Sequence, residues 1–271
     1  VEHPSDQEPL QIDTKHWRDL LTERVVELPA ADAEAKAFIG NVWYSSAPVP
    51  TVPFLVYVGA GEPHAQDIPT MIHGGSNGQL TVIPIDLKRG GLGHNYLIAS
   101  VIKGLRCLVA HAAARSVGFS PRCGPYSALR CLPTNDGKRS PPLLFTYSAP
   151  DGVMSLSGKD AAERDAAILT TTNLILVASS ALDAGKDIWW EGPVGRGKGC
   201  EPWAIVGQEE HSPLWKMSIM VAFIKDYKLS FIYCEQGAAG GDTPKATAWL
   251  ASPGLVPHFE REIGILPLAT P

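Results

Sequence analysis

A single cysteine, Cys123, lies in a polar segment with the sequence SPRCGPYSALR. Pro121 and Pro125 bracket this cysteine, and the positively charged Arg122 and Arg130 flank it. Two prolines stiffen a loop, while exposure and nearby positive charge favour the thiolate form that attacks electrophiles. The segment therefore indicates either a nucleophile for covalent catalysis or an unpaired thiol in a turn.

A glycine turn follows the apolar run at the start of VYVGAGEPHAQDIP, and Asp86 ends the next apolar run, LTVIPID. Gly59 and Gly61 would let the backbone approach a ligand, and a helix start after them would offer unpaired N–H groups. An acid at the end of the next strand can accept hydrogen bonds from a ribose. The pattern predicts a nucleotide or nucleoside cofactor; the alternative is a plain glycine turn and a solvated strand end.

These residues need a scaffold, and apolar runs alternate with helical patterns from residue 54 onward. Helices are expected over NYLIASVIKGL, over 160–185 between a capping Ser157 and Gly185, and over FIKDY. The expected strands are FLVYVGAG, LTVIPID, LRCLVA, KDIWWE and KLSFIYCE. Alternating strands and helices predict an α/β fold with a doubly wound, mostly parallel sheet, in which ligands bind at the carboxyl ends of the strands.

The first 53 residues differ from this pattern. Residues 14–28 place apolar side chains at helical spacing, a second helix is expected within ADAEAKAFIGNVW, and SSAPVPTVP is typical of a linker. The sequence thus predicts an N-terminal helical extension and linker over 1–53 and an α/β domain over 54–271.

Bulk composition limits the function classes. The net charge of −5 and the pI of about 5.9 disfavour nucleic-acid binding by overall charge, although a local basic groove stays open. The five cysteines form no C-x-x-C pair, which disfavours a disulfide scaffold and a zinc ribbon and favours a reducing, intracellular setting. The eight histidines form no H-E-x-x-H or H-x-x-x-H pair, so we expect no metal site. No apolar run reaches the roughly 18 residues of a membrane span, so no membrane contact is expected. A removed targeting segment stays open.

Several further motifs occur in a fixed order. After PRCGPYSALR come SPPLLFTYSAPDGVMSLSGKDAAERD, TTNLILVASSALDAG, IWWEGP, SPLWKM and FIYCEQGAAGGDTPKATAWLAS. Together with the glycine turn and Asp86, this series resembles the cytosine-C5 DNA methyltransferase-like family, and most closely its divergent branch in retroelements and large eukaryotic genomes. The order and spacing of these motifs carry the resemblance.

The resemblance implies a Rossmann-like fold that binds S-adenosylmethionine and methylates cytosine in nucleic acid, with the nucleus as one setting. Cys123 would attack C6 of the base, and Glu191 would bind its N3 edge. Arg130 would support the loop or a substrate phosphate. The cofactor would be held by Gly59, Gly61 and Asp86. Ser127 and Asn173 match family positions that would organise the site.

The chain also departs from the family pattern near the expected substrate face. Arg122 stands where the pattern has proline, and Gly192 replaces an asparagine. An extra segment, VGRGKGCEPWAIVGQEE, precedes SPLW, and no separate target-recognition domain is apparent. The rival hypothesis is therefore a non-catalytic protein that keeps the fold as a structural or interaction subunit of an assembly. A third is an enzyme that binds another nucleotide-like ligand.

Aromatic and basic residues in the second half give weaker signals. Arg196 and Lys198 either contact nucleic acid or form a solvated glycine-rich loop. The tryptophans are expected to pack in the core and at its rim rather than to stack on bases. These are Trp189, Trp190, Trp203, Trp215 and Trp249.

Overall fold

The structure is a computed structural model that describes residues 53–63, 67–131, 140–200, 203–235 and 246–262. Almost all of the expected N-terminal extension, residues 1–52, lies outside the described residues. So does the end of the chain beyond residue 262.

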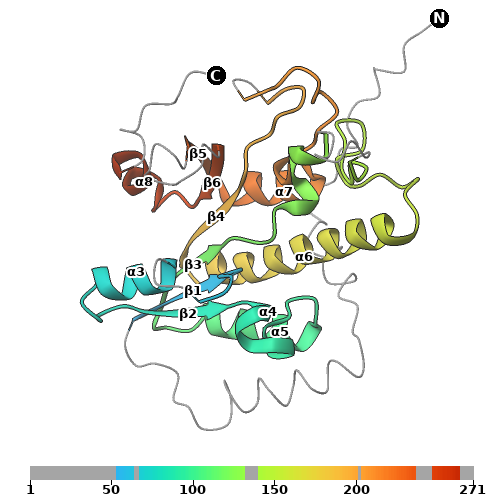
Figure 1. Ribbon diagram of the computed structural model, residues 1–271. Helices are drawn as coiled ribbons and strands as arrows, with labels where there is room; N and C mark the ends of the chain where they lie inside the picture. The colour runs from blue at the N-terminus through green and yellow to red at the C-terminus, as the bar shows by residue number, and fades with distance from the viewer. Residues whose placement is uncertain (1–52, 64–66, 132–139, 201–202, 236–245, 263–271) are drawn as a thin grey trace, which may run out of the picture.

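A six-stranded sheet with the order β2-β1-β3-β4-β6-β5 forms the centre of the fold (Figure 1). The neighbouring pairs among β1 to β4 are parallel, whereas β6 runs antiparallel to both β4 and β5. The expected α/β class is confirmed, with a sheet that is mixed but mostly parallel. The strands are β1 Phe54–Val58, β2 Thr81–Ile85, β3 Ala114–Phe119, β4 Asp187–Pro193, β5 Ser230–Glu235 and β6 Ala246–Ala251.

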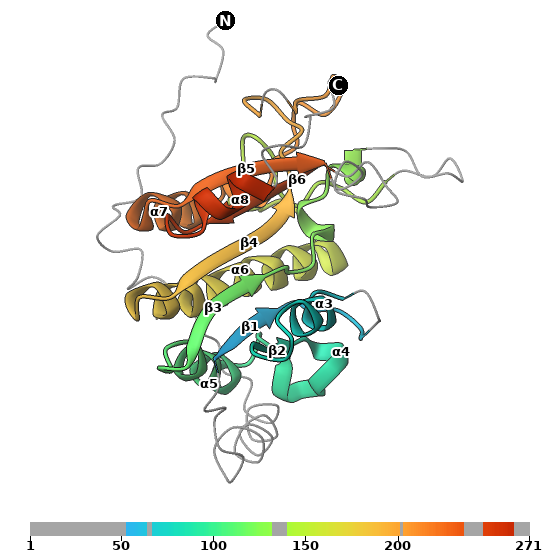
Figure 2. The same ribbon diagram turned by 90° about the vertical axis from the view of Figure 1, so that its left-hand side faces the viewer.

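Helices cover both faces of the sheet (Figure 2). On one face, α3 and α8 pack against Tyr57 and Trp189, and the opposite face holds α5, α6 and α7. The helices are α3 Ile68–Gly75, α4 Leu87–Gly90, α5 Ala99–Val109, α6 Gly158–Asp183, α7 Ser218–Tyr227 and α8 Val256–Glu262. The 3₁₀ turns are η3 Gly91–His94, η4 Gly124–Tyr126, η5 Ala128–Cys131 and η6 Leu214–Lys216.

The long helix α6 forms the centre of the larger core. It contacts α5, α7, β3 and β4, and Leu174, Ile175 and Ala178 on it are fully buried. Among the described residues, α6 is also the one helix long and apolar enough to cross a membrane by length and composition. Its burial against the sheet accounts for that composition, because a core helix needs the same apolar side chains.

The strand order reverses next to β1. The chain passes from β1 to β2 on one side of it and then to β3 on its other side. The carboxyl ends of β1 and β3 therefore flank a topological switch point, which is where open α/β sheets bind ligands.

One expected strand is wrong. The segment LRCLVA forms the end of α5, and the third strand begins only at Ala114. Leu105, Leu108 and Val109 are buried while Arg106 and Cys107 are exposed, which is the spacing of a helix face. A short apolar run does not distinguish the two structures, and here the helical spacing decides.

Candidate functional site

Residues that follow β1, β2 and β3 lie at the same edge of the sheet, where these parallel strands end (Figure 2). The sequence predicts that the fourth strand ends at Glu191, but β4 continues to Pro193 in its pairing with β6, so Glu191 lies within the strand. Four strand residues share one register row: Val58, Ile85, Phe119 and Trp190. The next residue in each strand direction is Gly59, Asp86, Ser120 and Glu191, respectively. The structure thus brings three of the residues singled out in the sequence, Gly59, Asp86 and Glu191, into one row across the switch point.

Gly59 lies where the carboxyl ends of β1, β2 and β3 come together. Its N–H donates to the carbonyl of Ile85 at 2.8 Å, and the N–H of Ser120 donates to the carbonyl of Val58 at 2.8 Å. A Cβ atom at Gly59, which has φ +82°, would lie 2.2 Å from the carbonyl oxygen of Ser120. Only glycine fits this position.

Asp86 holds the glycine turn in place. One carboxylate oxygen accepts a hydrogen bond from the Gly61 N–H at 3.0 Å, and the other accepts from the Lys88 N–H at 2.9 Å. Each carboxylate oxygen has a further lone pair, so the side chain can still accept from a ligand. Gly61 has φ +69°, and no atom of the residues described in the structure lies within 4 Å of the place where its Cβ would be. The turn is therefore fixed by Asp86 and open on its outer side.

The same turn is held by an ion pair that the sequence did not reveal. Arg89 donates to the carbonyl of Gly61 at 2.7 Å and to the carboxylate of Asp67 at 2.5 Å. The Asp67 side chain is only 4% exposed, and it also caps α3 by accepting from the Thr70 N–H. Asp67 followed by Ile-Pro is a sequence signal for the start of a helix. No local sequence pattern marks Arg89 as the partner of Asp67.

Glu191 takes part in a polar cluster with Ser120 and Tyr57. The Ser120 hydroxyl donates to Oε2 of Glu191 at 2.8 Å. Burial raises the pKa of Tyr57 to about 12; its hydrogen bond with Ser120 opposes this shift, and the charge of Glu191 adds to it. The ring of Tyr57 is stacked with Trp189 and lies over Gly118, where a Cβ would come within 2.7 Å of it. Neither Tyr57 nor Ser120 was singled out from the sequence as a site residue.

Cys123 lies in the segment 121–131, called the cysteine loop below, which begins directly after Ser120. It is three residues beyond Ser120, so their Cα atoms are at most about 11 Å apart. Cys123 is half-buried, and its carbonyl accepts from the Tyr126 N–H at 3.0 Å at the start of η4. None of the five cysteines, all within the described residues, is part of a disulfide. The thiol is thus three residues beyond Ser120, the hydrogen-bond partner of Glu191, and is only partly buried.

Arg122, next to the cysteine, is exposed but lies near the proposed cofactor region. Burial raises the pKa of Tyr96, the charge of Asp86 raises it further, and the positive charge of Arg122 opposes both effects. Asp86, which follows β2, and Arg122, next to Cys123, therefore act on the pKa of the same tyrosine in opposite directions.

Arg130 holds the cysteine loop against α6. Its guanidinium donates to the carbonyl of Gly124 at 3.3 Å and to that of Pro142 at 3.0 Å, and pairs with Glu163 of α6 at 2.5 Å. The Arg130 side chain is 10% exposed. Of the two roles expected for Arg130, these contacts match support of the loop.

His211 ties the cysteine loop to the extra segment at 194–210. Its Nδ1 accepts from the Arg196 N–H at 3.2 Å, which leaves the Nε2–H to donate to the carbonyl of Tyr126 at 2.9 Å. Burial lowers the pKa of His211, so the neutral ring is favoured. The Tyr126 hydroxyl in turn contacts Thr171 of α6 at 2.8 Å. No local sequence pattern marked His211.

The two positions expected to organise the site do make supporting contacts. Asn173 on α6 is buried, and its amide donates to the carbonyl of Tyr96 at 2.8 Å. The Ser127 hydroxyl accepts from the Leu129 N–H at 3.2 Å. In the part of the chain that the structure describes, no three His, Cys, Asp or Glu side chains gather as metal ligands.

Compared with known proteins, the chain matches no family model, and no curated protein or solved structure is significantly similar to it. The functional conclusion therefore depends on the arrangement of residues at the carboxyl edge of the sheet.

Proposed function

We propose that the protein is a Rossmann-like methyltransferase that binds S-adenosylmethionine and methylates cytosine in nucleic acid through a covalent bond to Cys123. One observation carries the proposal: Gly59, Asp86, Ser120 and Glu191 directly follow a single register row across the switch point. The antiparallel β6 between β4 and β5 is compatible with the same fold. The reaction would take place inside the cell, with the nucleus as one compartment.

The glycine turn and Asp86 fit the cofactor. The carboxylate already binds two backbone N–H groups and keeps lone pairs for ribose hydroxyls, and the outer side of Gly61 is open. S-adenosylmethionine would supply the methyl group. Arg89 and Asp67 would keep the turn rigid, since their buried ion pair fixes the Gly61 carbonyl.

Cys123 and Glu191 would act on the base. The thiolate would add to C6 of cytosine, which makes C5 nucleophilic toward the methyl group; loss of the C5 proton would then expel the thiolate. Glu191 would bind the N3 edge of the extruded base and stabilise the charge that develops there. Ser120 would fix the carboxylate of Glu191 through its hydrogen bond.

A second candidate is a non-catalytic subunit of an assembly that keeps this fold. The exposed Arg122, which stands where the resembled family has proline, favours it, as does the net charge of −5. Arg122 would then stabilise the loop without activating Cys123.

Calorimetric titration with S-adenosylmethionine tests the enzyme proposal. The chain should bind the cofactor, and Asp86→Ala should weaken binding about tenfold or more, since a charged hydrogen-bond acceptor is lost. The matched control is Asp165→Ala, because Asp165 is an exposed carboxylate on α6. Absence of binding by the unaltered chain would favour the non-catalytic subunit.

A further inference from the structure

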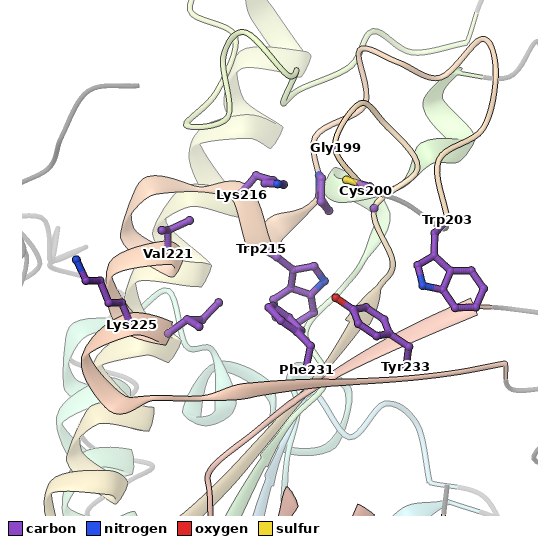
Figure 3. A pocket seen from close by; sticks show the side chains of 12 residues that line it. Gly199, Cys200, Trp203, Trp215, Lys216, Val221, Lys225, Phe231 and Tyr233 are labelled. Atoms are coloured by element: carbon purple, nitrogen blue, oxygen red, sulfur yellow. The ribbon is translucent and has the colours of Figure 1, made fainter. Parts of the chain in front are cut away.

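A pocket of about 400 Å³ lies beside β5 and α7 (Figure 3). It is on the face of the sheet opposite the Glu191 side chain. Neighbouring residues of a strand point to opposite faces, and Gly192, next to Glu191, lies under the ring of Trp215 in the pocket wall. The pocket lies between β5, α7 and the segment after β4. It is lined by Gly195, Gly199, Cys200, Trp203, Pro213, Trp215, Lys216, Val221, Ile224, Lys225, Phe231 and Tyr233.

Four aromatic rings form a continuous series along this pocket. Trp203 and Tyr233 have ring centroids 6.3 Å apart, and Tyr233 is stacked with Phe231 at 5.9 Å and an interplanar angle of 18°. Phe231 meets Trp215 edge to face at 5.3 Å. Such a series offers the π-faces on which a planar heteroaromatic ring stacks.

The pocket has a buried floor and an exposed rim. Trp203 and Trp215 are 7% and 8% exposed, and the indole N–H of Trp215 donates to the carbonyl of Pro193 at 3.0 Å. Tyr233 is 41% exposed and Val221 is 49% exposed. The buried tryptophans thus agree with the expected packing role, while Tyr233 remains available to a ligand.

The rim of the pocket is positively charged in a protein of net charge −5. Lys216 and Lys225 come from η6 and α7 (Figure 3), both are exposed, and neither forms an ion pair with another described residue. Among the described residues, the lining contains no Asp or Glu. Two lysines at the rim of a pocket lined with stacked rings complement a ligand that has both an aromatic ring and a negative charge.

We infer that this pocket binds a nucleotide, with its base against Phe231 and Tyr233 and its phosphate at Lys216 and Lys225. The volume lies within the range of small-ligand sites, about 300–1,000 Å³. The nucleotide is either free or part of a single strand, since both present the same base and phosphate. The inference does not depend on methyl transfer, because the pocket shares no residue with the proposed catalytic edge.

Titration with cytidine monophosphate and with a short single-stranded oligonucleotide tests the inference. Tyr233→Ala should weaken binding about tenfold, since a stacking platform is lost. The double change Lys216→Glu with Lys225→Glu should weaken it by a similar factor and reduce its salt dependence. A double change of two exposed lysines elsewhere, Lys103→Glu with Lys159→Glu, is the matched control.

If both ligands bind, the pocket accepts a free nucleotide. If only the oligonucleotide binds, the pocket accepts a nucleotide within a single strand. Binding should persist in Asp86→Ala and Cys123→Ser, which separates this pocket from the proposed cofactor site. The inference is overturned if neither ligand binds, if Tyr233→Ala leaves affinity unchanged, or if the control lysines matter equally.

Discussion

The hydroxyl of Ser120 donates a hydrogen bond to Oε2 of Glu191 over 2.8 Å, joining the residue after β3 to a residue within β4. This bond aligns the carboxylate with the start of the cysteine loop. Ser120→Ala should lower the free energy of unfolding by about 1–2 kcal/mol, since its hydrogen bonds with Glu191 and Tyr57 are lost, and should slow methyl transfer. Chemical denaturation and a transfer assay measure both effects. Ser148→Ala in an exposed turn is the control, and equal effects of the two changes would argue against a role for Ser120.

The close approach of Gly59 to Ser120 gives a steric prediction. Gly59→Ala would place a Cβ 2.2 Å from a backbone carbonyl oxygen at φ +82°. It should destabilise the fold by about 3 kcal/mol or more, because neither backbone can yield cheaply. Gly61→Ala has a similar φ but open space, so it should cost only about 1 kcal/mol. Urea unfolding of both variants measures the difference, and equal losses would contradict the described contact.

Arg130 should control the order of the cysteine loop. Arg130→Ala removes its bonds to Gly124 and Glu163 and should lower the free energy of unfolding by about 2 kcal/mol. Amide hydrogen exchange should accelerate around Cys123. Arg106→Ala, which removes an exposed arginine bonded to Ser180, is the matched control. An unchanged rate of amide hydrogen exchange in the cysteine loop would show that Arg130 does not hold the loop in place.

His211 should make the fold sensitive to mild acid. Its pKa is lowered by burial, so the unfolded chain binds the proton more readily than the folded one. Its contribution to stability is therefore complete when the pH is above about 6.5, the pKa of histidine in the unfolded chain, and is lost as the pH falls below that value. His94, whose pKa burial also lowers, acts in the same direction.

The test is the free energy of unfolding measured between pH 7.5 and 5.5. His211→Gln can keep the donor to the Tyr126 carbonyl but has no group that titrates in this range. The variant should lose less stability on acidification than the unaltered chain. Equal slopes for the two proteins would show that His211 does not titrate on unfolding.

Much of the scaffold could be predicted because its signals are local. The runs ending at Gly59 and Asp86 are β1 and β2, and α6 begins after Ser157 and ends before Gly185, which has φ +72°. The Ser157 side chain, however, makes no capping hydrogen bond. These elements depend on patterns within one segment, which a single sequence contains.

The missed features depend on contacts between distant segments. In β3, Arg115 and Gly118 interrupt the apolar pattern, and Gly118 is needed because Tyr57 and Trp189 pack over it. In β6, the sequence ATAWLA is rich in alanine, which has little preference for strands, and pairing with β4 and β5 decides its structure. The Arg89–Asp67 pair and the bonds of His211 likewise link segments that no local pattern connects.

The most direct test of the proposed function is covalent trapping on an oligonucleotide that contains 5-fluorocytosine. Fluorine at C5 blocks the loss that would release the thiolate, so the chain should remain attached in the presence of S-adenosylmethionine. The account predicts a denaturation-resistant adduct that disappears in Cys123→Ser and persists in Cys107→Ser, which changes an exposed thiol on α5. An adduct that survives Cys123→Ser, or no adduct in a chain that binds the cofactor, would contradict it.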